Sequence, residues 1–321
     1  MVQASEGPRR RGARIAIGAA IIAGCTAAIA FNLARTRRAE INAPPLGRFV
    51  NVDGARLHYV DRGVGRPIVL LHGNGASIED FETSGVMALG ADRYRMIAFD
   101  RPGFGYSDRP RSRVWTPGAQ ADLIHGAFEE LGIERPIIVG HSFGALVALA
   151  LAIRHPEKIG GLVLVSGYYF PTPRPDVLVA IPTAIPLIGD MMANSLSPLL
   201  ARALTPAIRT AIFSPLPAPG RTSRWPVEMA LRPSQIRASA VDGALMIPAA
   251  HILRRHYAKL ELPVEIVAGD GDLVVNTRSH AKRLHGVIPG SSCEIIAGQG
   301  HMPHHDRPQH IVAAIDRIAS R

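Results

Sequence analysis

The sequence has little cysteine, few aromatic residues and comparatively few acids. Its two cysteines, Cys25 and Cys293, are far apart, and Cys25 falls in an apolar run, so we expect no disulfide framework. Aromatic residues make up 5% of the chain and do not alternate with basic ones as they do in nucleic-acid-binding surfaces. The hydrophobic share is 47%, which is ample for one large buried core.

The shortage of acids gives a formal net charge of +10. Half of that excess lies in residues 1–40, where seven arginines face two glutamates, a balance of +5. The remainder is spread over the rest of the chain. We therefore expect no nucleic-acid partner. The residues that carry the N-terminal excess are Arg9, Arg10, Arg11, Arg14, Arg35, Arg37 and Arg38.

An apolar run fills residues 15–33, between those arginines. Its length of about 19 residues suits a helix that crosses a bilayer. A permanent single-pass anchor is favoured because the run continues for the full spanning length. Two alternatives stay open, a cleaved secretory signal at Ala28-Ile29-Ala30 and a lipoprotein signal with Cys25 as the lipidated residue. We predict a basic tail and membrane segment over residues 1–38 and a linker over 39–48.

The rest of the chain alternates short apolar runs with helical patterns. Strands are expected at residues 49–52, 56–60, 68–71, 96–99, 137–139, 162–165, 264–267 and 292–296. Helices are expected at 120–131, 146–153, 278–284 and 308–318. This alternation predicts an α/β fold with a mostly parallel sheet covered by helices on both faces. The core is assigned to residues 49–167 and 251–321.

Residues 168–250 interrupt the alternation. They hold 13 of the 26 prolines, too many for regular strands. The segment also contains apolar clusters. We predict a helical insertion that caps the carboxyl edge of the sheet and encloses an apolar pocket.

The sequence Gly140-His141-Ser142-Phe143-Gly144 joins a predicted strand to a predicted helix. This is the setting of a nucleophile elbow, in which a serine stands on a sharp turn and small flanking residues let strand and helix approach. Ser142 is therefore the predicted nucleophile.

A serine needs a base, and the base needs a carboxylate. His301 follows the last predicted strand, and Asp272 lies in the loop after residues 264–269, so both reach the same edge of the sheet as Ser142. Asp270 competes with Asp272 but more simply shapes the turn. The group His301, His304, His305 and Asp306 also permits a metal-site interpretation, although no second cluster supports it. Otherwise His304 and His305 are expected in a solvated loop. No metal and no cofactor are predicted.

The sequence His72-Gly73-Asn74-Gly75 follows the strand at 68–71. Such a loop can turn a backbone N–H toward the nucleophile. The backbone N–H groups of Asn74 and Phe143 are predicted to form the oxyanion hole. The stretch from Asp100 to Asp108 follows another strand and is interpreted as a structural loop whose charges brace each other.

Together these motifs resemble the α/β-hydrolase superfamily in order and spacing, from about Phe49 to the C-terminus. The resemblance implies that Ser142, Asp272 and His301 are nucleophile, acid and base, and that residues 168–250 form the family's helical cap. A serine at the elbow speaks against the haloalkane dehalogenase and epoxide hydrolase branches, which use aspartate there. A membrane-anchored member with a Gly-His-Ser elbow is similar to ester hydrolases that act on lipids.

The predicted activity is hydrolysis of a small-molecule carboxylic ester, with lipid-like esters included, through an acyl-enzyme. Two alternatives stay open: a cofactor-free perhydrolase or C–C bond hydrolase on the same triad, and a non-catalytic binding protein that keeps the fold. The acyl group, the alcohol group and the oligomeric state are not readable from the sequence.

Overall fold

The computed structural model describes residues 8–321 of the chain, so the first seven residues of the predicted basic tail lie outside it. One eight-stranded sheet organises the globular part, in the order β1-β2-β4-β3-β5-β6-β7-β8. The strands are β1 (Arg48–Val52), β2 (Ala55–Arg62), β3 (Pro67–Leu71), β4 (Arg95–Phe99), β5 (Ile137–His141), β6 (Gly161–Val165), β7 (Val264–Gly269) and β8 (Ser292–Ile296).

Strand direction follows the sequence pattern closely. β1 and β2 form an antiparallel hairpin through Asp53-Gly54, and β2 pairs antiparallel with β4. All pairings from β4 to β8 are parallel. The central strands β3, β5 and β6 are continuous apolar runs because both of their faces are covered. All eight predicted strands are confirmed.

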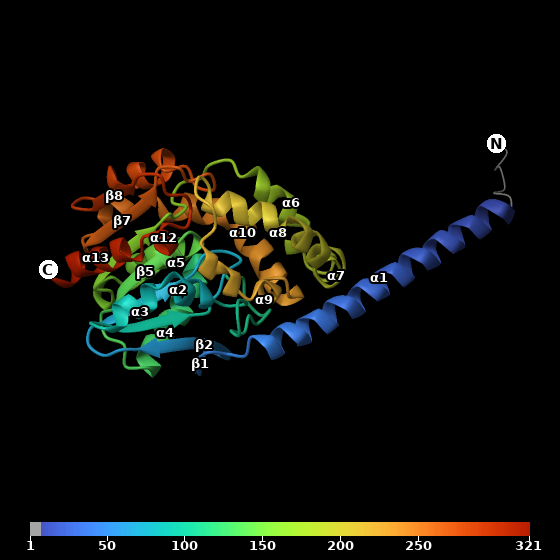
Figure 1. The fold of residues 1–321 in the computed structure, drawn as a ribbon, viewed down its shortest axis with the longest axis horizontal. Coiled ribbons are helices and arrows are strands. Elements are labelled where there is room, and N and C mark those ends of the chain that lie inside the picture. Colours follow the sequence, from blue (N-terminus) through green and yellow to red (C-terminus); the bar gives the residue numbers. More distant parts are fainter. Residues whose placement is uncertain (1–7) are drawn as a thin grey trace.

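Helices cover both faces of the sheet (Figure 1). One face packs under α4 (Pro117–Glu130), α5 (Phe143–Arg154) and α11 (Arg283–His285), which follows a short π-helical turn at Arg278–Lys282. The other face packs under α2 (Glu79–Ser84), α3 (Val86–Ala91) and α13 (Pro308–Ala319). This arrangement confirms the predicted α/β-hydrolase architecture.

Between β6 and β7 the chain forms a layer of helices over the carboxyl edge of the sheet. They are α6 (Pro175–Ala184), α7 (Ile188–Asn194), α8 (Leu196–Phe213), α9 (Val227–Ala230) and α10 (Pro233–Leu253). Prolines stand at the first helical positions of α6 and α10, where the missing N–H costs nothing. Pro182, Pro206 and Pro248 lie inside helices. We call these helices the cap.

The helix α1 (Pro8–Asn42) projects from the globular part as a long rod (Figure 1). Its segment Ala16–Asn42 is long and apolar enough to cross a membrane. The helix runs four residues into the segment predicted as a linker. Ala39 is buried there and Glu40 pairs with Arg232 of the cap at 2.9 Å, so tertiary contacts extend the helix.

Candidate active site

Ser142 stands at the turn between β5 and α5. Its backbone has φ 52° and ψ −115°, a left-handed conformation that is strained for a residue with a side chain. The flanking glycines are required by contact. A Cβ on Gly144 would lie 2.1 Å from the Leu71 carbonyl oxygen, and one on Gly140 would lie 2.6 Å from the Gly144 oxygen. The two glycines therefore allow β5 and α5 to approach closely on either side of Ser142.

His301 and Asp272 meet Ser142 at this edge. The His301 Nε2 lies 3.0 Å from the Ser142 Oγ, and its Nδ1 lies 2.8 Å from the Asp272 Oδ2. His301 is 4% exposed and Asp272 is 8% exposed, so bulk water hardly screens their interaction. The structure thus brings together the three side chains that the sequence had singled out separately.

The carboxylate of Asp272 is fixed by its own loop. Its Oδ1 accepts the backbone N–H groups of Val274 and Val275, both at 2.8 Å, which leaves Oδ2 for the histidine. Asp270 has a different place, because its Oδ1 accepts the N–H of Gly298 at 2.8 Å across to the loop after β8. The two aspartates therefore have different partners, and it is Asp272 that contacts His301.

The loop after β3 passes directly beside Ser142. A Cβ on Gly73 would lie 3.1 Å from the Ser142 Cβ, a tight contact that glycine avoids. Phe143 is the first residue of α5, and its N–H is among those without a partner inside the helix. The Asn74 side chain turns away and donates to the Ser239 carbonyl of the cap at 3.0 Å. Only the backbone of Asn74 is therefore left for the oxyanion role predicted for it.

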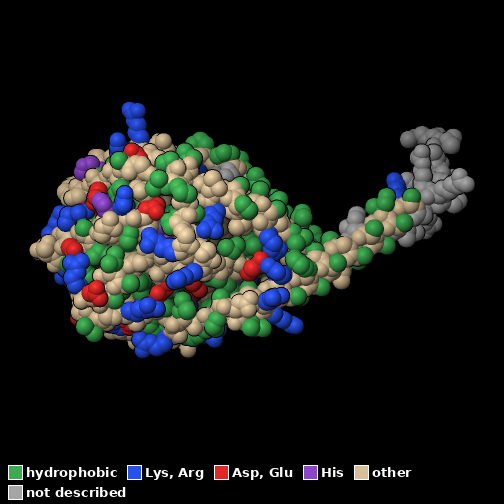
Figure 2. Space-filling view, in the orientation of Figure 1, with side chains coloured by type: hydrophobic (Ala, Val, Ile, Leu, Met, Phe, Trp, Pro, Cys, Tyr) green, Lys and Arg blue, Asp and Glu red, His purple; other side chains and the backbone are tan. Residues whose placement is uncertain are grey.

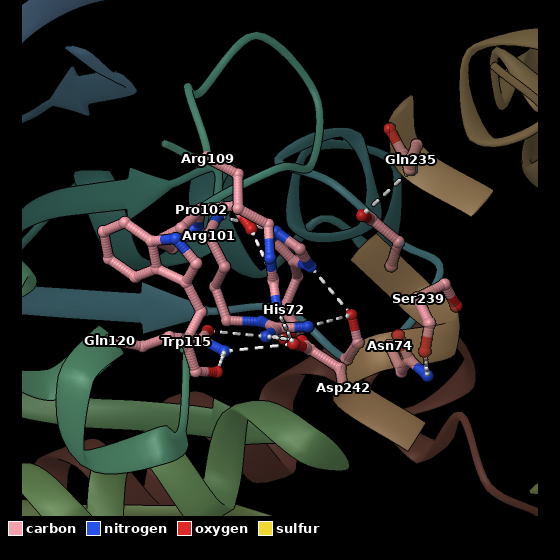
Figure 3. Close-up of polar contacts among 12 residues, drawn as sticks. His72, Asn74, Arg101, Pro102, Arg109, Trp115, Gln120, Gln235, Ser239 and Asp242 are labelled. Carbon is pink, nitrogen blue, oxygen red and sulfur yellow. Dashed lines mark hydrogen bonds and ion pairs between the residues drawn. The ribbon is translucent and has the colours of Figure 1, made fainter. Parts of the chain in front are cut away.

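A buried ion pair ties this loop to the cap (Figure 3). Arg101 is fully buried, donates to the carbonyl oxygens of His72 and Gly73, and meets the Asp242 carboxylate of α10 at 2.6 Å. Arg109 binds the other oxygen of Asp242 at 2.8 Å. One aspartate from the cap thus binds two arginines of the core, one of which, Arg101, holds the loop that passes Ser142.

The prediction for the Asp100–Asp108 stretch is corrected by these contacts. The stretch is structural, but its charges do not brace each other. The Asp100 Oδ2 lies 2.6 Å from the His58 Nδ1, and Arg101 pairs with Asp242 of the cap. The sequence carried one usable signal for Asp242, a lone acid within the otherwise apolar stretch of α10.

A second polar cluster lies near His301 and is centred on Asp80 of α2. The Asp80 Oδ1 lies 2.7 Å from His305 Nε2 and 3.2 Å from His304 Nε2. Burial alone would raise the pKa of Asp80, but these two histidines outweigh it and hold that pKa well below its usual range. His304 and His305 are fully buried, so the expectation of a solvated loop was wrong. The buried carboxylate of α2 draws them inward.

His141 links this cluster to the predicted base. Its Nε2 lies 3.1 Å from the His301 carbonyl oxygen, which can only accept, so Nε2 carries the proton. Burial and the neighbouring His304 hold the pKa of His141 well below its usual range. The backbone of His301 is therefore supported by the residue that precedes Ser142.

The alternative metal group of His301, His304, His305 and Asp306 does not assemble, because Ser142 and Asp272 bind His301. Side-chain ligand atoms of Asp80, His141 and His304 do lie within 4.8 Å of one another. Hydrogen bonds to the Asp80 carboxylate account for much of that proximity.

A cleft of about 580 Å³ lies elsewhere, between α1, α2 and α9. Arg35 and Arg38 of α1 line it together with Glu79, Trp225 and Met229. Its lining does not include Ser142, His301 or Asp272, so we treat it as a feature of the contact between α1 and the cap.

Comparison with known proteins gives a consistent result. The profile of the family described as alpha/beta hydrolase fold matches residues 66–308. An uncharacterized protein of Mycobacterium tuberculosis is 33% identical over 301 residues, which cover 86% of this chain and 82% of that protein. A 2-hydroxymuconate semialdehyde hydrolase of Pseudomonas sp. strain CF600 is 40% identical over 133 residues, covering 40% of this chain and 47% of that one. A solved structure titled as a membrane phospholipase A superposes with a TM-score of 0.65 and 24% identity, covering 98% of this chain and all of its own.

Proposed function

Because this chain belongs to the α/β-hydrolase family, we propose that it is a serine hydrolase that cleaves carboxylic esters through Ser142, His301 and Asp272. The observation that carries the proposal is the continuous contact from the Ser142 Oγ through the His301 ring to the Asp272 carboxylate, at 3.0 and 2.8 Å. A hydroxyl, an imidazole and a buried carboxylate in this order suit acyl transfer, because the imidazole takes the hydroxyl proton and the carboxylate orients and stabilises the imidazole.

The proton positions follow from the partners. The Asp272 carboxylate accepts, so His301 carries its proton on Nδ1 and presents the Nε2 lone pair to the Ser142 hydroxyl. His301 takes the hydroxyl proton as Oγ attacks the ester carbonyl, and Asp272 stabilises the imidazolium. His301 then gives the proton to the leaving alcohol. Water, activated by the same histidine, releases the acid from the serine ester.

The oxyanion of the tetrahedral intermediate is assigned to the backbone N–H groups of Asn74 and Phe143. Two observations support this assignment. Gly73 brings the loop within van der Waals contact of Ser142, and Phe143 lies at the N-terminal end of α5, where the helix dipole favours negative charge. The Arg101–Asp242 pair holds the loop in that position.

A membrane location is the second part of the proposal. The apolar helix α1 supports a single-pass anchor, and the structural likeness to the membrane phospholipase A extends over 98% of this chain and so takes in most of α1. We therefore propose lipid-like esters as the substrate class. Cleavage of the segment as a secretory signal and lipidation at Cys25 are the alternatives. Extraction of membranes with alkaline carbonate tests the anchor, and release of the full-length chain into the supernatant would contradict it.

The C–C bond hydrolases are a second candidate class, because a partial relative is a 2-hydroxymuconate semialdehyde hydrolase. The same triad would serve either reaction. Turnover of a series of p-nitrophenyl and phospholipid esters beside a ring-cleavage product such as 2-hydroxymuconate semialdehyde separates the two. Turnover of the ring-cleavage product alone would overturn the ester assignment.

The nucleophile itself is tested by covalent labelling. The Ser142→Ala variant should lose reaction with a fluorophosphonate probe and all ester turnover, whereas Ser320→Ala, at an exposed position near the C-terminus, should keep both. Unchanged labelling of Ser142→Ala would remove Ser142 from the mechanism.

A further inference from the structure

The outer surface of the cap is apolar. Among the described side chains, 13 of the 25 exposed large apolar ones lie between residues 178 and 216. Exposed fractions are 82% for Leu187, 71% for Val179, 64% for Leu178 and 63% for Met191. We call this surface, on α6, α7 and α8, the apolar face. A monomeric soluble protein rarely leaves so many large apolar side chains together in water.

The charges within this segment are few and largely neutralised. Asp190 pairs with Arg111 at 2.8 Å and with Arg237 at 2.9 Å. Arg202 pairs with Glu228 at 2.7 Å. Because these charges are few and paired, apolar side chains are the main feature that the segment presents to its surroundings. Figure 2 shows hydrophobic side chains gathered along the side of the globular part where the cap helices meet α1.

Contacts with α1 set the depth at which the apolar face would lie relative to a bilayer that α1 crosses. Asn32 is buried, and its side-chain amide donates to the carbonyl oxygens of Asn194 and Ser195, at 3.0 and 2.8 Å, where α7 passes into α8. Asn32 lies at the end of the apolar run of α1. A helix rises 1.5 Å per residue, so the run spans roughly the hydrocarbon core of a bilayer and the α7–α8 junction lies level with its edge.

Basic side chains follow at the height of lipid head groups. Arg37 and Arg38 are exposed in the next turn of α1, and Arg35 pairs with Glu228 of the cap at 2.5 Å. Arginines at this level are suited to anionic head groups. An apolar surface at the edge of the hydrocarbon and cations just beyond it form the pattern of a segment that lies in a membrane interface.

We propose that the apolar face is a second membrane attachment, and that α6, α7 and α8 lie within the head-group and upper acyl region of an anionic bilayer. The inference rests on the proposed anchoring by α1, because that helix gives the face its orientation. A bilayer is the occupant because the face continues from the apolar run of α1 at the matching height. The cap is therefore monotopic, and its helices need not cross the membrane.

A fluorescence experiment on the full-length chain tests this. A cysteine is introduced at Leu187 or at Leu200 of the apolar face in a Cys25→Ser, Cys293→Ser background and labelled with an environment-sensitive nitrobenzoxadiazole dye. Val64, 83% exposed on the turn between β2 and β3, gives the matched control. Cys25 itself, kept in a Cys293→Ser chain, reports the insertion of α1. The protein is reconstituted into phosphatidylcholine–phosphatidylglycerol vesicles.

We expect the dyes at positions 187 and 200 to shift to the blue and to be quenched by lipids that carry a doxyl group near the head group. Quenching by lipids with the doxyl group near the chain end should be weaker there and stronger at Cys25. The dye at position 64 should stay in water.

Three results would overturn the attachment. Dyes at 187 and 200 that behave like the one at 64 mean that the face stays in water. Dyes that shift to the blue but resist both doxyl lipids mean that a second copy of the chain covers the face. Strongest quenching by the deep doxyl group means that the segment crosses the membrane. Quenching at Cys25 is measured separately, so failure of the α1 anchor can be distinguished from failure of the cap attachment. The experiment does not depend on esterase activity.

Discussion

The hydrolase core and the cap use similar apolar residues in opposite ways. In the core, β3, β5 and β6 bury nearly all of their apolar side chains between helices, and polar groups such as Arg101 are buried with partners. In the cap, Leu178, Val179 and Leu187 stand exposed on the outside. The contrast shows that apolar content does not decide burial. The sheet gives the core residues partners on both faces, whereas the outer helices of the cap have partners on one side only.

The same contrast adds a feature that the sequence did not predict. The apolar residues of the insertion were predicted to enclose a pocket, but many of the largest point outward. The inward side of the cap contributes buried apolar side chains, such as Met246, Ala250 and Leu253, and also a polar group, the Asp242 carboxylate. The core and the cap are therefore held together partly by a buried charge network.

The largest expected effect is on chemistry in the core. Replacing Asp272 by Asn keeps the shape but lets His301 adopt the wrong tautomer, so kcat should fall by about 10⁴-fold on a p-nitrophenyl ester. Asp270→Asn is the matched control and should change kcat far less, because Asp270 binds Gly298 and not His301. Equal losses in the two variants would contradict the assignment of the acid.

The next effect is on the junction between core and cap. Asp242→Ala leaves Arg101 buried without its carboxylate, and removal of one partner of a buried pair costs about 3–5 kcal/mol. We expect chemical denaturation to show a loss of that order in the free energy of unfolding. A double variant, Asp242→Leu with Arg101→Met, should recover part of it. No recovery would mean that the cost arises from packing and not from the unpaired charge.

The third effect is on the pH dependence of stability. Histidine titration acts through the core, because residues 168–250 contain no histidine. Burial, aided by the charge of Arg101, lowers the pKa of His72 from 6.5 to about 4. The unfolded chain therefore binds more protons between pH 6.5 and 4, and stability falls as the pH drops through that window. The contribution of His72 is at most about 3 kcal/mol.

The pH effect is measured by thermal or denaturant unfolding across that range. His72→Gln should flatten the decline, whereas the exposed His256→Gln should leave the slope unchanged. A wild-type slope in the His72→Gln variant would show that other buried groups carry the whole effect.

The smallest effect is expected on the surface of the cap. Arg111 is 68% exposed and pairs with Asp190 at 2.8 Å. An exposed pair contributes less than about 1 kcal/mol, so Arg111→Ala should hardly change the free energy of unfolding. A loss as large as that of Asp242→Ala would mean that surface and buried pairs do not differ here.

Local sequence was sufficient to predict most of the strands, turns and helices of the core. Gly140, Gly144 and the runs of branched apolar residues predict a strand, a sharp turn and a helix because the steric and hydrophobic requirements are local. The order of strands and turns also brought Asp272 and His301 to the edge that carries Ser142, because parallel strands deliver their carboxyl ends to one side.

Only the tertiary structure decided which distant groups meet. Asp80 with His304 and His305, and Arg101 with Asp242, pair across more than a hundred residues of chain, and no spacing rule links them. It also decided which apolar residues of the cap face outward, since helical periodicity gives a face but not its neighbour. Sequence alone determined the chemistry expected at Ser142, because the residues that form a nucleophile elbow are adjacent in the chain. Burial and exposure depend on what packs against each residue, and that is a property of the whole fold.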